Sequence, residues 1–160
     1  MDIFKFAIQM ETDGEGYYRQ LASKAVHPGI KGVLNQLADD EVKHRQAIEH
    51  IQGKTGVFAE TTVLEAAKNV FQQIQDFGGG FDLTGDEEAA YRQAMELEQK
   101  SINFYLDRLD QVDNPAQKAL FEKLAKEEKK HYHLMINLVD FVASPKTWLE
   151  DAEFNRLDEY

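Results

Sequence analysis

Two short motifs place a carboxylate and an imidazole one helical turn apart. The pattern E-x-x-H occurs at Glu41 and His44 and again at Glu128 and His131. Residues three or four positions apart are neighbours on one face of a helix. In both motifs that face also carries large apolar side chains, so the acid and the imidazole are predicted to point into a helical core. Burying an unpaired charge is costly, so these side chains need a chemical reason to lie there.

The two motifs belong to a longer internal repeat. A constant offset of 87 residues pairs Glu11 with Glu98, Tyr18 with Tyr105, Glu41 with Glu128 and His44 with His131. Glu11 and Glu98 also lie in apolar stripes of their own. A duplicated pair of helices would give such a repeat. It predicts four carboxylates and two imidazoles that face one core.

Four carboxylates gathered in a core repel one another, and protonation neutralises only one or two of them. A pair of divalent cations satisfies the whole set. Carboxylate and imidazole ligands suit two iron ions, with manganese or a mixed pair as the alternative. The competing interpretation is a plain helical bundle in which each Glu reaches water at its boundary, because E-x-x-H alone is a weak motif. The agreement of spacing, apolar context and repeat favours the two-metal site.

Long helices must position these side chains. No stretch alternates with period two, which predicts an all-α fold. Helical hairpins are predicted at about 2–52 and 86–143, joined by a crossover at 53–85 that carries a short helix at 61–77, with a C-terminal helix or tail at 144–160. Pro28 is expected to stop the first helix, the second helix to begin near Ile30, and the first helix of the second hairpin to end near Val112. Long helices in two hairpins suit a four-helix bundle. The 160 residues are enough for one domain, 1–160.

The composition argues against several classes of protein. A net charge of −11 disfavours binding to nucleic acid and to anionic membrane surfaces, because both need a basic patch. No apolar run approaches the roughly 20 residues of a membrane span, and residues 1–12 lack the pattern of a signal peptide. The chain has no cysteine, which excludes disulfides and thiolate metal sites and fits a cytoplasmic location.

On these motifs, residues 1–143 resemble the ferritin-like di-iron carboxylate superfamily, and more narrowly its rubrerythrin group. The long crossover between hairpins is also typical of a ferritin-like four-helix bundle. The resemblance implies terminal metal ligands at Glu11 and Glu98, bridging ligands at Glu41 and Glu128, and one histidine for each metal at His44 and His131. It also implies that Tyr18 and Tyr105 hydrogen-bond near the cluster, with ordinary core packing as the alternative.

Two departures from the rubrerythrin pattern matter. Full-length rubrerythrins carry a rubredoxin-like module with four cysteines, which these residues lack, so an external rubredoxin-like electron donor is implied. Rubrerythrins also usually carry a second Glu one turn after the first on the third bundle helix, where this chain has Ser101. Glu15, one turn beyond Glu11, is a candidate for an extra ligand, and an exposed helix glutamate is the alternative interpretation.

The resemblance implies a di-iron peroxidase that reduces hydrogen peroxide to water. The alternative enzyme is a ferroxidase that oxidises ferrous iron with oxygen for detoxification or storage. A third hypothesis is a metal-stabilised helical bundle that docks a partner, since fold does not fix function. Dimers are the commonest assembly, so a homodimer is expected. Gly78, Gly79 and Gly80 in the crossover would let hairpins exchange between chains.

Overall fold

Five α-helices and one short 3-10 helix make up the described part of this computed structural model, residues 2–52, 60–76 and 85–144. In chain order they are α1 (Ile3–Lys24), α2 (Pro28–Gln52), α3 (Val63–Asp76), α4 (Gly85–Asp107), η1 (Leu109–Gln111) and α5 (Pro115–Ala143). No strand occurs within these three ranges, and the all-α prediction is confirmed.

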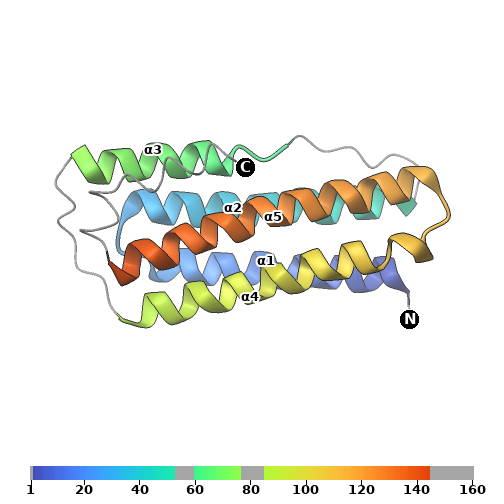
Figure 1. Cartoon of the computed structure of the whole chain (residues 1–160), viewed down its shortest axis with the longest axis horizontal. Helices are drawn as coiled ribbons and strands as arrows, with labels where there is room; N and C mark the ends of the chain where they lie inside the picture. The colour runs from blue at the N-terminus through green and yellow to red at the C-terminus, as the bar shows by residue number, and fades with distance from the viewer. Residues whose placement is uncertain (1, 53–59, 77–84, 145–160) are drawn as a thin grey trace.

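The four long helices pair as two hairpins. α1 packs along α2 and α4 packs along α5, with fewer contacts between the hairpins. Figure 1 shows the four helices running along the long axis of the molecule, with α3 outside them along α2. α3 contacts both α2 and α5. A four-helix bundle whose two hairpins are joined by a long connection is the ferritin-like arrangement that the sequence predicted.

Capping side chains set two of the helix starts. Asp2 accepts hydrogen bonds from the backbone N–H groups of Phe4 at 3.0 Å and Lys5 at 3.4 Å. Asn114 caps α5 in the same way, and Pro115 follows it in the first turn. Both caps satisfy backbone donors that have no partner inside the helix. They fix the starting points of two helices that carry candidate ligands.

Two helix ends differ from the sequence-based expectation. α2 begins at Pro28, whereas the sequence indicated a start near Ile30. Proline fits the first helical turn, where its missing N–H is not needed. α4 ends at Asp107 rather than near Val112, because the 3-10 turn η1 takes over before the link to α5.

Two apolar clusters fill the bundle, with a polar layer between them. The first includes Tyr18, Leu37, Tyr91, Leu134 and Phe141. The second includes Ala7, Ile48, Phe104, Tyr105 and Phe121. Along α2 and α5, the buried acids and histidines lie in sequence between members of the two clusters. Burial of the apolar side chains on both sides therefore holds the polar layer in place.

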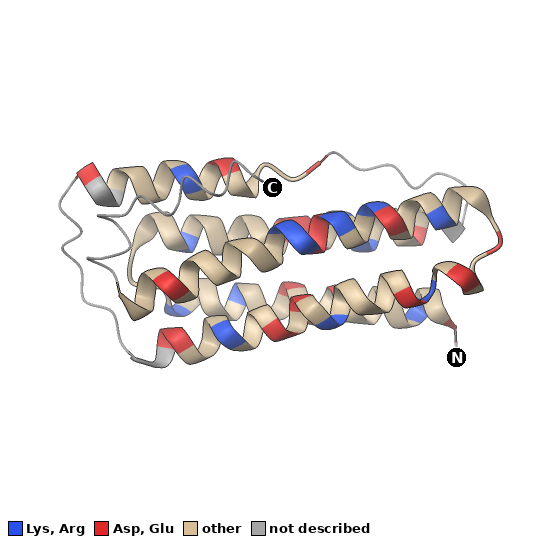
Figure 2. Ribbon diagram, in the orientation of Figure 1, with Lys and Arg blue, Asp and Glu red and all other residues tan. Residues whose placement is uncertain are grey.

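The surface of the described helices is charged and mixed. Figure 2 shows Lys and Arg interspersed with Asp and Glu along the helices. None of the described helices is both long enough and apolar enough to span a membrane. The predicted C-terminal helix or tail after Ser144 lies outside the described residues, and so does the crossover stretch with Gly78, Gly79 and Gly80.

Candidate metal centre

Six buried side chains from four helices meet in the polar layer. α1 supplies Glu11, α2 supplies Glu41 and His44, α4 supplies Glu98, and α5 supplies Glu128 and His131. None of the six is more than 4% exposed. They form two groups of four residues, and the ligand atoms of each group lie within 4.8 Å of one another. Glu41 and Glu128 belong to both groups, as two neighbouring metal ions that share carboxylates would require.

The first group surrounds one ring nitrogen of His44. Its Nδ1 lies 3.3 Å from Glu11 Oε2 and 3.1 Å from Glu128 Oε1. Glu41 Oε2 is 3.9 Å from the same nitrogen. Carboxylates from α1, α2 and α5 therefore converge on a single imidazole nitrogen.

The second group repeats this arrangement around His131. Its Nδ1 lies 3.2 Å from Glu41 Oε1 and 3.4 Å from Glu98 Oε1. Glu128 Oε2 is 3.4 Å from the same nitrogen. The rings of His44 and His131 stack with centroids 5.6 Å apart and planes 19° apart. The internal repeat thus places two similar ligand groups side by side.

Two further buried carboxylates lie beside the outer nitrogens of the histidines, and sequence reasoning missed both; Asp40 is within hydrogen-bond distance and Glu127 is farther away. His131 Nε2 lies 3.1 Å from Asp40 Oδ2, and His44 Nε2 lies 4.0 Å from Glu127 Oε2. Both acids are 2% exposed. A carboxylate on the outer nitrogen fixes the tautomer and orientation of a metal-binding imidazole. The signal was present in the repeat, because the 87-residue offset pairs Asp40 with Glu127.

Thr61 joins these two outer carboxylates. Its hydroxyl donates to Asp40, and its backbone N–H lies 3.1 Å from Glu127 Oε2 and 3.3 Å from Oε1. Lys43 and Lys130 lie 3.6 Å and 3.8 Å from the same two acids. A residue of the connection between the hairpins therefore contacts the outer support of both ligand groups.

The two predicted tyrosines reach across the bundle to the candidate terminal ligands. The Tyr18 hydroxyl on α1 donates to Glu98 on α4, and the Tyr105 hydroxyl on α4 donates to Glu11 on α1. Burial and the neighbouring Glu98 raise the pKa of Tyr18 well above its ordinary value. Burial and Glu11 do the same to the pKa of Tyr105. Both hydroxyls therefore stay protonated and act as fixed donors to the carboxylates.

The charges in the polar layer shift one another strongly. Burial lowers the pKa of His44, but the charges of Glu128 and Glu11 outweigh it and raise the value to about 10. Burial and then Glu128 raise the pKa of Glu98 to about 8. Burial and neighbouring carboxylates also raise the pKa of Glu41 well above its usual range. Without metal, protons therefore supply the positive charge that the layer needs.

Two buried polar side-chain atoms among the described residues make no hydrogen bond, and both belong to this layer. They are Glu128 Oε2 and His131 Nδ1. Buried polar atoms are nearly always partnered, so an unpartnered pair indicates a missing partner such as an ion. Carboxylate oxygens and imidazole nitrogens are ligands that iron and manganese both accept. The two Glu/His groups therefore fit a binuclear metal site, for which the donors do not select one metal.

Two of the positions singled out in the sequence lie outside the ligand groups. Arg45 Nη1 binds Glu15 Oε2 at 2.6 Å, and the two described groups do not include this glutamate. Ser101 lies on α4 one turn after Glu98 and lines a pocket that reaches Glu41 and Glu98.

Comparison with known proteins identifies the family and supports the fold. The family model described as Rubrerythrin matches residues 2–139. The chain is also similar to the solved structure of a hypothetical protein from Pyrococcus furiosus, with a TM-score of 0.66 and 22% identity over 89% of each chain, which supports the fold alone. No curated protein matches it. These 160 residues have no cysteine and so no rubredoxin module. Because the family match covers most of its length, the chain belongs to the rubrerythrin family.

Proposed function

We propose that this chain binds two iron ions in the polar layer and reduces hydrogen peroxide to water. Glu11 and Glu98 would be terminal ligands, Glu41 and Glu128 bridging ligands, and His44 and His131 would each bind one metal through Nδ1. The observation that carries the proposal is the pair of ligand groups that share Glu41 and Glu128. The unpartnered Glu128 Oε2 and His131 Nδ1 support it.

The reaction balances with electrons from outside. Hydrogen peroxide takes up two electrons and two protons, its O–O bond breaks, and two water molecules leave. A reduced iron pair supplies both electrons together when it is bound. The electron donor would be a separate rubredoxin-like protein, since these residues contain no cysteine with which to build such a module.

The chain's own residues would keep the ligands in register. Tyr18 and Tyr105 donate to the carboxylates of Glu98 and Glu11, which limits how far those side chains can turn. Asp40 accepts from His131 Nε2 at 3.1 Å and leaves Nδ1 to face the carboxylates. Preorganised ligands of this kind need no rearrangement during the reaction. The apolar clusters cover the layer at both ends along the bundle axis.

Ferroxidase activity is the second candidate, because the same six residues would serve it. Ser101 supports this alternative, because the position one turn after Glu98 carries no carboxylate. In that case oxygen would be the oxidant and ferrous iron the substrate. A homodimer is the assembly we propose in either case.

Stopped-flow oxidation of the anaerobically iron-loaded protein tests the proposal. Hydrogen peroxide and oxygen are supplied at equal concentration, and the ferric absorption is followed. We expect two irons per chain to oxidise much faster with peroxide, and a Glu41→Ala variant to lose both iron and peroxide consumption. Oxidation by oxygen at an equal or higher rate would contradict the peroxidase proposal and support a ferroxidase.

A further inference from the structure

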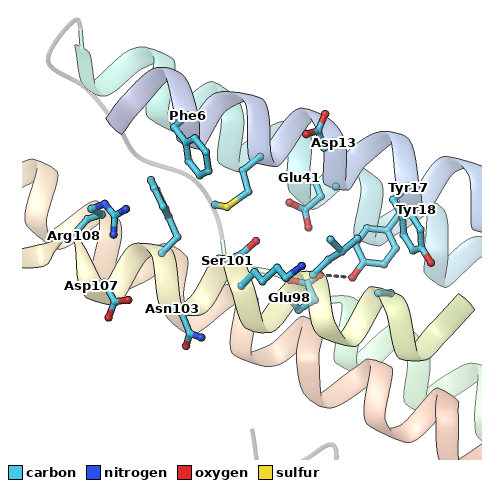
Figure 3. Close-up of a pocket in the computed structure, with 16 residues that line it drawn as sticks. Phe6, Asp13, Tyr17, Tyr18, Glu41, Glu98, Ser101, Asn103, Asp107 and Arg108 are labelled. Atoms are coloured by element: carbon cyan, nitrogen blue, oxygen red, sulfur yellow. Dashed lines mark hydrogen bonds between the residues drawn. The ribbon is translucent and has the colours of Figure 1, made fainter. Parts of the chain in front are cut away.

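A pocket of about 450 Å³ opens between α1 and α4 and ends at the candidate metal centre. Figure 3 shows Glu41 and Glu98 pointing into it from opposite walls, with Tyr18 hydrogen-bonded to Glu98. Glu41 and Glu98 are each 4% exposed, whereas Glu11 and Glu128 are each 1% exposed. The pocket therefore reaches the centre from the side of the two more accessible carboxylates.

Small residues keep the inner end of the pocket open. Gly14 lines it, and a Cβ at this position would lie 3.3 Å from both Cδ and Oε2 of Glu41. Ser101 lines the opposite wall. The 87-residue offset pairs Gly14 with Ser101, so each of α1 and α4 has a small residue one turn after its candidate terminal ligand. A side chain of ordinary size at Gly14 would crowd the route to Glu41.

The outer walls are apolar and partly exposed. Phe6, Met10, Leu97 and Phe104 line this part of the pocket. Phe6 is 43% exposed and Leu97 is 37% exposed. A cavity of this size is typical of sites for organic molecules and far exceeds what hydrogen peroxide needs. Walls of this character suit a ligand with an apolar body.

The charges at the rim select no ion. Asp13 and Asp107 are acidic, and Lys100 and Arg108 are basic. The guanidinium of Arg108 lies over the ring of Phe104 at 4.9 Å from its centroid, which uses part of its charge in a cation–π contact. Carboxylates line the inner end and would repel an anion. A neutral ligand fits this distribution best.

We propose that this pocket binds neutral organic hydroperoxides, with their apolar group against Phe6, Leu97 and Phe104 and their O–O bond toward Glu41 and Glu98. This inference rests on the proposed function and names a substrate class for the same site. The hydroperoxide takes up two electrons from the separate donor and two protons. Its O–O bond breaks, and one molecule of alcohol and one of water leave.

Binding of a product alcohol tests the pocket without any turnover. The probe is 2-phenyl-2-propanol, titrated into the full metal-free chain and followed by chemical-shift changes in its NMR spectrum. We expect saturable binding that a Leu97→Trp variant weakens at least ~10-fold, about 1.4 kcal/mol. The matched control is Leu106→Trp, since Leu106 is a similarly exposed leucine on α4, at 40%, that does not line the pocket. It should bind the alcohol as the parent chain does.

A second variant and a rate ratio complete the test. Ser101→Leu fills the inner end of the pocket and should lower the affinity for the alcohol by a similar factor. The test then does not depend on whether Leu97→Trp folds. In the iron-loaded chain, the ratio of kcat/KM for cumene hydroperoxide to kcat/KM for hydrogen peroxide should fall ~10-fold in Leu97→Trp and stay constant in Leu106→Trp.

The outcomes separate this inference from the proposed function. Reduction of hydrogen peroxide without any binding of the alcohol would overturn the inference and leave the proposed function standing. Binding of the alcohol without reduction of either peroxide would overturn both. If the parent chain binds no alcohol and Leu97→Trp changes the mass measured by light scattering, a second copy covers this face and the inference is wrong.

Discussion

Thr61 is the residue through which the outer supports of both ligand groups are connected. Its hydroxyl donates to Asp40 and also accepts from the Val63 N–H at 3.1 Å. Burial alone would raise the pKa of Asp40, but the hydrogen bond and charge of His131 together with the hydrogen bond from Thr61 and the charge of His44 outweigh it and lower the pKa. Asp40 is therefore an ionised, buried acceptor, and such groups depend on every donor they have.

Replacing Thr61 with valine should damage one ligand group more than the other. The backbone N–H to Glu127 remains, while Asp40 loses its hydroxyl donor. We expect the free energy of unfolding to fall by about 1–3 kcal/mol. We also expect the affinity for one of the two metals to fall ~10- to 100-fold, because the orientation of His131 is less restrained. Titration with Mn²⁺, followed by electron paramagnetic resonance, measures both affinities.

Two further variants make the Thr61→Val experiment specific. Thr61→Ser keeps the hydroxyl and should restore the affinity. Thr62→Val removes a hydroxyl that accepts a surface hydrogen bond from Gln36 Nε2 at 2.8 Å, so metal binding should not change. Equal losses of affinity in Thr61→Val and Thr62→Val would contradict the role of Thr61.

The inner ligands were predicted from the sequence, whereas the outer supports were overlooked although the repeat pairs Asp40 with Glu127. Glu11 and Glu98 stand out because an acid interrupts an apolar stripe. Asp40 and Glu127 stand beside other charged residues in "DDE" and "KEE", where a solvated helix face is the ordinary interpretation. Thr61 was expected in the first turn of a short helix at 61–77, whereas it lies two residues before α3, in the connection between the hairpins. Only tertiary packing brings it to both acids.

At the scale of the element, two glycines on α1 have opposite surroundings. A Cβ at Gly14 would lie 3.3 Å from the Glu41 carboxylate, whereas a Cβ at Gly16 would meet nothing within 4 Å. Glycine inside a helix costs about 0.5–1 kcal/mol relative to alanine. At Gly16 no neighbouring atom requires a glycine. At Gly14 the missing side chain leaves space for the Glu41 carboxylate.

Gly16→Ala should therefore stabilise the chain by about 0.5–1 kcal/mol and leave Mn²⁺ affinity unchanged. Gly14→Ala should gain less, because Glu41 must shift by a few tenths of an ångström to accept the new methyl group. The shift should weaken Mn²⁺ binding ~10-fold. Thermal unfolding and Mn²⁺ titration on both variants give the comparison. Equal Mn²⁺ affinities in the two would show that Gly14 has no steric role.

The helices themselves were largely predictable, because breakers are few and the apolar stripes are long. The ends were less so. Pro28 was expected to stop a helix, yet it opens α2 from inside the first turn. The last turn of α4 was expected to continue, yet the chain tightens into η1 near Leu109 before it turns toward α5. Such ends depend on where the next helix must pack, which local sequence does not encode.

At the scale of the whole molecule, the polar layer makes metal-free stability depend on pH. In the folded chain the pKa of Glu98 is about 8 and that of His44 is about 10, against ordinary values near 4.5 and 6.5. Between pH 4.5 and about 8 at Glu98, and between pH 6.5 and about 10 at His44, the folded chain holds a proton that the unfolded chain has released. The contributions are fully present below the ordinary values and are lost as pH rises through about 8 and about 10.

The Tm of the metal-free protein should therefore fall as pH is raised from about 6 to about 10. Calorimetry at intervals across this range measures it. The Glu98→Gln variant cannot release a proton at this position, so it should lose the part of the decline that lies below about pH 8. A metal-free Tm that rises with pH over this range would contradict the proton assignment.

Metal should replace those protons and stabilise the whole bundle, because the ligand groups join all four long helices. At a free Mn²⁺ concentration of 100 times Kd, binding adds about 2.7 kcal/mol, which raises Tm by roughly 5–10 °C in a chain of this size. Glu41 belongs to both ligand groups, so Glu41→Gln should lose most of this rise and bind fewer than two ions per chain. Glu15→Gln is the matched control on the neighbouring helix, since Arg45 holds that carboxylate outside the groups. Equilibrium dialysis measures the number of bound ions per chain, and calorimetry on the same samples measures Tm. Loss of one ion in Glu15→Gln would show that Glu15 is a ligand.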